Sequence, residues 1–117
     1  MKKAFYLSTC DTCKKILNTL NLPEDIELQD LKTKNIGVAD LEYLREQVSS
    51  YQDLLNKRAR IYKELNLKER TLEDREIKVL ILEHYTLLKR PVIVYQDAFF
   101  IGNSKSTKQE LQDYFNE

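Results

Sequence analysis

Residues 4–17 read AFYLSTCDTCKKIL, and this stretch holds both cysteines of the chain, Cys10 and Cys13. An apolar run, Ala4 to Leu7, precedes them and a helix-like run follows, which indicates a strand, a Cys-x-x-Cys loop and a helix. A thiol at the start of a helix lies beside unpaired backbone N–H groups and the positive end of the helix dipole, which favour the thiolate. The pattern therefore predicts a thiol redox site, with Cys10 as the nucleophile and Cys13 as the resolving thiol.

The residues around the two cysteines support this interpretation but leave two alternatives open. Lys14 and Lys15 follow directly and are expected to lower the pKa of Cys10, while Thr12 between the cysteines is expected to be a structural part of the site. The alternatives are two inert buried cysteines or half of a zinc site. A four-ligand zinc site needs two more ligands, and the chain offers only His84 and carboxylates, so no bound metal is expected.

Composition narrows the class of protein further. The 117 residues fit one domain, and 19 acidic residues balance 19 Lys and Arg residues. This balance gives no electrostatic reason to expect direct binding to nucleic acid or to a membrane. No signal peptide is expected, because Met1-Lys2-Lys3 leads to no long apolar stretch. A cysteine pair without an export signal predicts a reducing, cytoplasmic location.

The rest of the chain alternates between strand-like and helix-like patterns. Four strands are predicted, at Lys3–Leu7, Ile26–Leu28, Val92–Tyr95 and Ala98–Ile101. Helices are predicted at Cys13–Leu20, from Val38 to Val48, over the charged segment Leu54–Leu65, from an N-cap at Thr71 through Ile77, Ile81, His84 and Leu88 to a stop at Pro91, and after a capping box that begins at Ser106.

The predicted order is strand, helix, strand, helical block, strand, strand, helix. A strand–helix–strand unit implies a parallel pair, and the closing hairpin around Gln96-Asp97 must be antiparallel. We therefore expect an α/β fold in which residues 1–117 form a single domain. Its four-stranded mixed sheet would carry an inserted helical block, about residues 36–88, between the second and third strands.

With Cys-x-x-Cys after the first strand and Arg90-Pro91 before the third, the chain resembles a thioredoxin-like fold. Within that superfamily it resembles the arsenate reductase-like family that includes the Spx regulators. The resemblance covers nearly the whole chain. The matching blocks are Tyr6-x-x-x-Cys10-x-x-Cys13-Lys14-Lys15, then Leu54-Leu55-Asn56-Lys57-Arg58 with Tyr62-x-x-Leu65-Asn66-Leu67, and then Lys89-Arg90-Pro91-Val92-Ile93-Val94 with Ile101-Gly102.

The resemblance implies a nucleophile at Cys10 and three arginines that bind an oxyanion. One arginine position is kept as Arg90, one is Asn56 here, and the third falls in the segment 102–105, which has no Arg. Arg58 instead matches the Spx-like members, although these carry a glycine ahead of that block and residues 48–53 contain none. The chain therefore keeps one of the three arginines and matches neither subfamily completely.

The resemblance also implies a cis Arg90–Pro91 bond packed against the cysteine loop, which would present Arg90 to an anion at Cys10. The alternative is a helix stop with a solvated arginine. Arg58 and Arg60 are candidates for a second anion contact or a partner-binding face, against the alternative of an ordinary solvated helix. His84 is interpreted as a core-edge residue rather than a general base.

The leading functional hypothesis is a cytoplasmic thiol-dependent oxidoreductase related to arsenate reductases. Its substrate would be a small oxyanion or a disulfide, and its electrons would come from glutathione, glutaredoxin or thioredoxin, with no bound cofactor. The alternative is a redox-sensing regulator like Spx that binds RNA polymerase and uses the cysteine pair as a switch.

Overall fold

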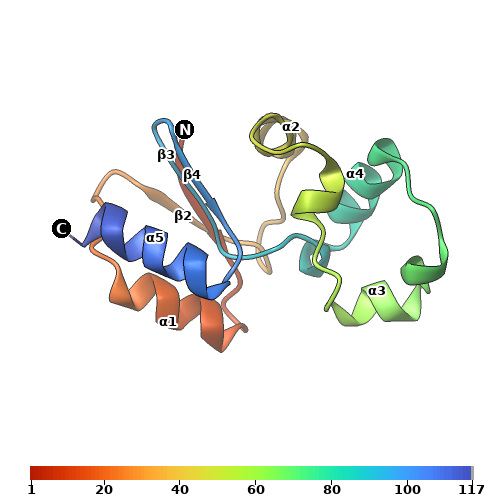
Figure 1. Cartoon of the computed structure of the whole chain (residues 1–117), viewed down its shortest axis with the longest axis horizontal. Helices are drawn as coiled ribbons and strands as arrows, with labels where there is room; N and C mark the ends of the chain where they lie inside the picture. Colours follow the sequence, from red (N-terminus) through yellow and green to blue (C-terminus); the bar gives the residue numbers. More distant parts are fainter. Residues whose placement is uncertain (117) are drawn as a thin grey trace. The chain divides into compact units, whose positions relative to one another are not determined.

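The computed structural model describes residues 1–116, which form two compact units. The first unit combines Met1–Lys34 with the chain from Arg90 onward, and the second is the segment Asn35–Lys89. Figure 1 labels the helices and strands of both. No helix among the described residues is long and apolar enough to cross a membrane.

The first unit is built on a four-stranded mixed sheet with the strand order β2-β1-β3-β4. Strand β1 (Lys2–Tyr6) pairs in parallel with β2 (Glu27–Asp30) and antiparallel with β3 (Val92–Tyr95), which pairs antiparallel with β4 (Ala98–Ile101). The predicted sheet is confirmed. The β3 and β4 strands run antiparallel because a short hairpin turn joins them, whereas β1 and β2 run parallel because a helix joins them. This is the sheet of a thioredoxin-like fold.

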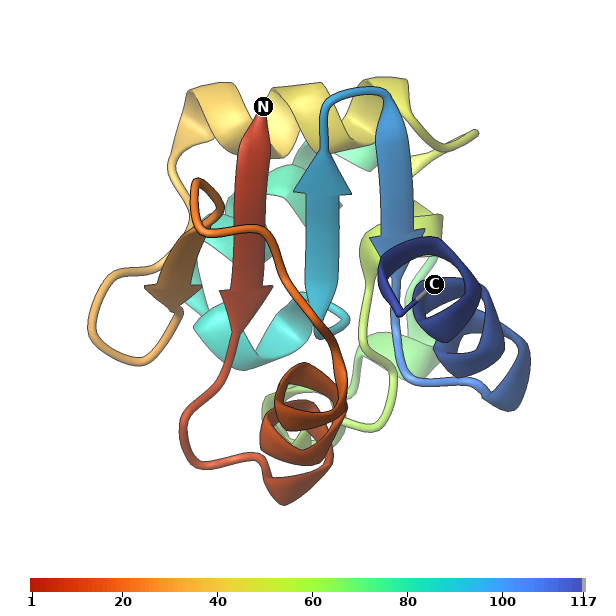
Figure 2. The same ribbon diagram turned by 90° about the vertical axis from the view of Figure 1, so that its left-hand side faces the viewer.

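Two helices of the first unit, α1 (Asp11–Thr19) and α5 (Lys105–Phe115), lie side by side in both views of the ribbon (Figures 1 and 2). Both pack on the sheet through one buried cluster, which consists of Ala4, Ile16, Leu20, Ile93 and Leu111. The apolar residues of α1 recur at helical spacing, so one stripe of the helix meets the sheet and the opposite stripe stays in solvent.

The start of α5 differs from the prediction. Ser104, not Ser106, is the N-cap, and its Oγ accepts the backbone N–H of Thr107 at 3.2 Å. Gly102 has a φ of +88°, a turn conformation that suits glycine and ends β4 early enough for the helix to begin at Lys105. The predicted capping residue was therefore wrong by two positions.

The second unit consists of short helices and turns rather than long helices. Its elements are α2 (Val38–Glu46), η1 (Tyr51–Leu54), α3 (Arg60–Glu64), η2 (Leu67–Glu69), α4 (Asp74–Glu83) and η3 (Tyr85–Leu87). The prediction of helix over Leu54–Leu65 was wrong for the first half of that segment. Leu55 there forms an antiparallel bridge with Leu88, and Lys89 N–H donates to the Leu54 carbonyl at 2.9 Å.

Helix α4 is shorter than predicted at both ends. Its N-cap is Glu73 rather than Thr71, and Glu73 and Glu76 form a reciprocal capping box. The helix stops after Glu83, so His84 and Leu88 do not continue its stripe. The amide of Asn35 explains the early stop, because its Nδ2 donates to the Ile81 and Leu82 carbonyls, both at 3.0 Å, and so satisfies the last turn.

Candidate active site at the cysteine pair

Cys10 is the N-cap residue of α1, so the helix begins at Asp11, two residues before the predicted start. Its N–H donates to the Leu7 carbonyl at 2.9 Å, and its carbonyl accepts the Lys14 N–H at 3.2 Å. The first bond ties Cys10 to the end of β1, and the second opens the helix. The side chain of Cys10 therefore sits where the first backbone N–H groups of α1 lack partners within the helix.

The two cysteines differ sharply in environment. Cys13 is fully buried, whereas Cys10 is partly exposed, and neither is in a disulfide. Burial, together with the interaction with Cys10, raises the pKa of the Cys13 thiol to about 12, despite a hydrogen bond from the Leu7 backbone that favours the thiolate. Cys13 therefore holds its proton in the reduced protein and acts as a donor toward its neighbour.

Cys10 is activated by that donor. Partial burial is the largest single influence and would raise the pKa of the Cys10 thiol, but the backbone N–H and the thiol of Cys13 act against it. The positive charge of Arg90 and a hydrogen bond from its side chain lower the pKa further, so the result lies below the ordinary cysteine value. The leading contributions come from Cys13 and Arg90 and not, as the sequence suggested, from Lys14 and Lys15.

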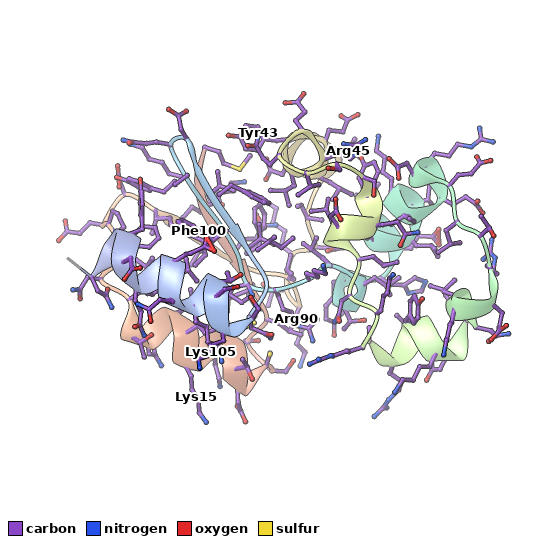
Figure 3. The ribbon with its side chains drawn as sticks, in the orientation of Figure 1. Lys15, Tyr43, Arg45, Arg90, Phe100 and Lys105 are labelled. Atoms are coloured by element: carbon purple, nitrogen blue, oxygen red, sulfur yellow. The ribbon has the colours of Figure 1, made fainter. Side chains whose placement is uncertain are left out.

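Arg90 contacts Cys10 although the two residues are far apart in the sequence. The Arg90–Pro91 peptide bond is cis, as expected from the resemblance, and Pro91 is buried at the entry to β3. Figure 3 labels Arg90 in the first unit, together with Lys15 on α1 and Lys105 on α5. The alternative of a solvated arginine at a helix stop was wrong, since Arg90 is only partly exposed and contacts the Cys10 thiol.

The loop between β1 and Cys10 is held by a residue that the sequence did not single out. Asp30, at the end of β2, accepts the backbone N–H groups of Ser8 and Lys32 through Oδ1, both at 3.1 Å. A hydrogen bond from the Ser8 side chain is the main reason that the pKa of Asp30 is lowered. Only the pairing of β1 with β2 brings Asp30 to this loop, so no local pattern could have revealed it.

The remaining candidate site residues lie in different parts of the structure. Thr12 is exposed in the first turn of α1, beside the cysteines. Arg58 belongs to the second unit, where it is exposed and its backbone N–H donates to Asn56 Oδ1 at 3.1 Å. Arg60 is the exposed first residue of α3, and His84 is the C-cap of α4. The roles of Arg58 and Thr12 therefore stay predictions.

Asn56 stands at one of the arginine positions that the resemblance implies, and its side chain has a structural task. Its Nδ2 donates to the Thr86 carbonyl at 3.2 Å while its Oδ1 accepts the Arg58 N–H. The amide is thus used within the second unit. Among residues 1–116, no three His, Cys, Asp or Glu side chains gather as metal ligands would.

Comparison with known proteins agrees with this fold and cysteine pair. Residues 5–111 match the ArsC family. The chain is 27% identical to an arsenate reductase of Haemophilus influenzae over 105 residues, which are 85% of this chain and 90% of the relative. It is 36% identical to the global transcriptional regulator Spx 2 of Oceanobacillus iheyensis over 61 residues, or 52% of this chain and 45% of that regulator.

The fold also matches solved structures. An arsenate reductase from Vibrio cholerae superposes with a TM-score of 0.68 at 20% identity, covering 96% of this chain and 97% of the other. At that identity the superposition establishes the fold alone. Since the family match spans most of the sequence, this chain, a thioredoxin-like protein with an N-terminal cysteine pair, belongs to the ArsC family of arsenate reductase-like proteins.

Proposed function

We propose that this protein is a thiol-dependent reductase in which Cys10 is the nucleophile and Cys13 resolves the intermediate. One observation carries the proposal: Cys10 accepts hydrogen bonds from Cys13 and Arg90, which lower its pKa, while burial keeps Cys13 protonated. This difference in pKa leaves Cys10 as a thiolate that can attack a substrate and Cys13 as a thiol that can react in the next step.

The chemistry follows from these two states. With a disulfide substrate, the Cys10 thiolate attacks one sulfur, forms a mixed disulfide and releases the other half as a thiolate. Cys13 then loses its proton and attacks the Cys10 sulfur, which releases the second half of the substrate and leaves a Cys10–Cys13 disulfide. Two electrons pass from the pair to the substrate, and a thiol donor returns them.

Arg90 is proposed as the anion contact of the site, and Pro91 as the residue that holds it there. A guanidinium can form paired hydrogen bonds to an oxyanion or to a carboxylate near a substrate sulfur. Arg58 is a second candidate contact. The substrate class is a small oxyanion or a disulfide, and the donor is glutathione, glutaredoxin or thioredoxin in a reducing cytoplasm.

Arsenate is a poor candidate for the physiological substrate. Of the three arginine positions that the family resemblance implies, only Arg90 is kept. Losing two arginines removes charge-assisted hydrogen bonds of about 1.5–3 kcal/mol each, or roughly two to four decades in affinity, of which Lys105 could restore only a part. Asn56 cannot turn to an anion without giving up its bonds to Thr86 and Arg58.

A reduction assay tests the proposal. Purified protein would be offered arsenate and mixed disulfides of glutathione, with each candidate donor in turn. We expect turnover of a disulfide that Cys10→Ser abolishes, and that Cys13→Ser slows unless an external thiol replaces the resolving step. Equal rates for the wild type and Cys10→Ser would refute the assignment of the nucleophile.

A second function has a specific observation behind it. The 36% identity to an Spx regulator over 61 residues favours a redox switch that binds RNA polymerase. Co-purification of tagged protein with RNA polymerase, compared under reducing and oxidising conditions, separates the two. Redox-dependent capture without any reductase turnover would favour the regulator.

A further inference from the structure

Asp30 lies where the end of β2 meets the part of the chain that leads to Cys10. Strands β1 and β2 run in parallel, and their register places Asp30 beside Tyr6, the last residue of β1. Figure 2 shows these two strands side by side. The Leu31 N–H donates to the Tyr6 carbonyl at 2.8 Å, so the pairing continues to the point where β1 ends. Asp30 is therefore next to the loop 7–10, which ends at the reactive thiol.

The carboxylate of Asp30 holds this loop. Its Oδ1 accepts the Ser8 N–H and the Lys32 N–H, both at 3.1 Å. The side chain of Ser8 also forms a hydrogen bond with Asp30, and this bond is the main cause of the lowered pKa of Asp30. Ser8 lies 22 positions before Asp30, so these bonds join two segments that are distant in the sequence. The carboxylate therefore binds both polar donors of one loop residue.

Asp30 is itself fixed by the turn that follows it. Its backbone carbonyl accepts the N–H groups of Thr33 and Lys34 at 3.1 and 3.0 Å, and the Thr33 hydroxyl at 3.1 Å. Together with the bond from the Lys32 N–H to the Asp30 side chain, these bonds close residues 30–34 into a turn. Because its own backbone is held in this way, Asp30 can hold the opposite loop in one place.

The position of the Cys10 sulfur depends on the conformation of the loop 7–10. The Cys10 N–H donates to the Leu7 carbonyl at 2.9 Å, which closes these residues into a turn that contains Ser8. Cys10 then has the extended backbone of an N-cap residue, with φ −102° and ψ 108°. Bonds that fix Ser8 within this turn therefore also limit the movement of the chain up to Cys10.

The reactivity of Cys10 requires that its sulfur stay close to two groups. The backbone N–H of Cys13 and the guanidinium of Arg90 both favour the Cys10 thiolate. Such interactions weaken steeply when the distance or the angle departs from the ideal. The leading influences on the pKa of Cys10 are burial, Cys13 and Arg90, and the charge of Asp30 is not one of them. An effect of Asp30 on the thiol must therefore act through the loop.

We propose that Asp30 is a positioning residue for Cys10: by accepting both donors of Ser8, it fixes the loop 7–10 so that the Cys10 sulfur stays at the first N–H groups of α1. The inference deepens the proposed function, on which it rests, because it gives the end of β2 a role in presenting the nucleophile. Reactive side chains need placement within about 0.5 Å, which supporting hydrogen bonds supply. Asp30 takes no part in the making or breaking of bonds.

The rate at which iodoacetamide alkylates Cys10 in the reduced protein, followed by mass spectrometry as a function of pH, tests this role. Asp30→Ala should slow alkylation at neutral pH about two- to tenfold, the equivalent of one neutral hydrogen bond, and should move the pH midpoint upward. Asp30→Asn keeps an oxygen that accepts the Ser8 N–H and should retain most of the wild-type rate. Asp30→Glu keeps the charge but displaces the carboxylate by one methylene group, and should be slowed like Asp30→Ala.

Asp53 provides a matched control in the second unit. Its Oδ2 accepts the N–H groups of Ser49 and Ser50 at 3.1 and 3.2 Å, so it binds two backbone donors as Asp30 does. Both Ala variants should lower the free energy of unfolding, but only Asp30→Ala should change the pH profile of Cys10. Urea unfolding of both variants separates lost stability from lost positioning. If Asp30→Ala does not fold, Asp30→Glu takes its place in every comparison.

The outcomes distinguish this inference from the proposed function. Slower alkylation of Cys10 in Asp30→Ala, with recovery in Asp30→Asn, supports the positioning role even if no substrate is turned over. An unchanged pH profile in Asp30→Ala, or an equal loss of rate in both variants, overturns it. Faster alkylation in both variants also overturns it, because that is the effect of removing a negative charge. Each contrary result leaves the proposed function standing as long as the wild type reduces a disulfide and Cys10→Ser does not.

Discussion

Cys13 and Cys10 interact within a single helical turn: Cys13 is fully buried, and its backbone N–H and its thiol both lower the pKa of the Cys10 thiol. As a result, the two chemically identical thiols differ in protonation: Cys13 keeps its proton, whereas Cys10 loses its proton more readily. Burial determines which of them keeps it, and this assigns the order of attack.

Titration of the two thiols should show this inequality. We expect the pKa of Cys10 to lie below the free value of about 8.5 and that of Cys13 to lie far above it. Thiolate absorbance against pH in the wild type, in Cys10→Ser and in Cys13→Ser measures both. Cys13→Ser should keep a lowered Cys10 step, because the backbone N–H and Arg90 remain. A Cys10 midpoint at or above the free value contradicts the prediction.

Arg90→Gln should raise the pKa of Cys10, since it removes the guanidinium that stabilises the thiolate. Alkylation of Cys10 at neutral pH should slow by about tenfold, which corresponds to the low end of the range for one lost hydrogen bond to a charged group. Iodoacetamide kinetics followed by mass spectrometry measure the rate. Arg75→Gln removes the same charge from an exposed site in the second unit and should leave the rate unchanged.

Stability should fall at alkaline pH because of Cys13. Its pKa is about 12 in the folded protein, against 9.0 ordinarily, so the folded state binds a proton that the unfolded state releases. The stabilisation is therefore complete below about pH 9 and is lost as the pH rises toward 12. Urea unfolding across this range should show a steeper loss in the wild type than in Cys13→Ala. Parallel pH profiles would contradict the assignment.

Mild peroxide should produce an intramolecular Cys10–Cys13 disulfide. Two cysteines that share the first turn of a helix lie close enough for the bond, and an attacking thiolate with a nearby thiol favours closure over further oxidation. Mass spectrometry should detect the loss of two hydrogens. Cys13→Ser should instead accumulate sulfenic or sulfinic acid on Cys10. Only intermolecular products in the wild type would exclude a resolving role for Cys13.

Arsenate turnover by the unmodified chain should be weak. Asn56→Arg should improve arsenate binding, because it restores a charged fork, and should lower stability by about 1–3 kcal/mol through the lost amide bond to Thr86. Binding and urea unfolding of the same variant test both effects. Arg58→Ala should leave arsenate binding little changed. Efficient arsenate reduction by the wild type, lost in Cys10→Ser, would show that three arginines are not needed.

The sheet and the reactive end of α1 were predictable because their signals are local. Apolar runs such as Val92–Tyr95 predict strands, and a Cys-x-x-Cys motif between a strand and a helix predicts a thiol site from its own residues. The cis Arg90–Pro91 bond followed from the family resemblance rather than from the residues themselves.

The helix ends and the activating contacts were not predictable, because distant residues decide them. Asn35 ends α4 by donating to the carbonyls of Ile81 and Leu82, which are 46 and 47 positions away in the sequence, and no pattern inside the helix predicts this contact. The lowered pKa of Cys10 was expected from Lys14 and Lys15, which are adjacent in sequence, but it depends on Arg90, which tertiary structure brings into contact.

The distance in sequence between Cys10 and Arg90 has a consequence for the growing polypeptide. A ribosome-bound chain presents Cys10 long before Arg90 has been synthesised, so the newly made thiol lacks the guanidinium that helps to ionise it. The loop before Cys10 also lacks the hydrogen bond between the Ser8 N–H and Asp30 until β2 pairs with β1. An unfinished chain therefore carries a cysteine of more ordinary reactivity, and full sensitivity to oxidants arises only after Arg90 has been synthesised and the first unit has folded.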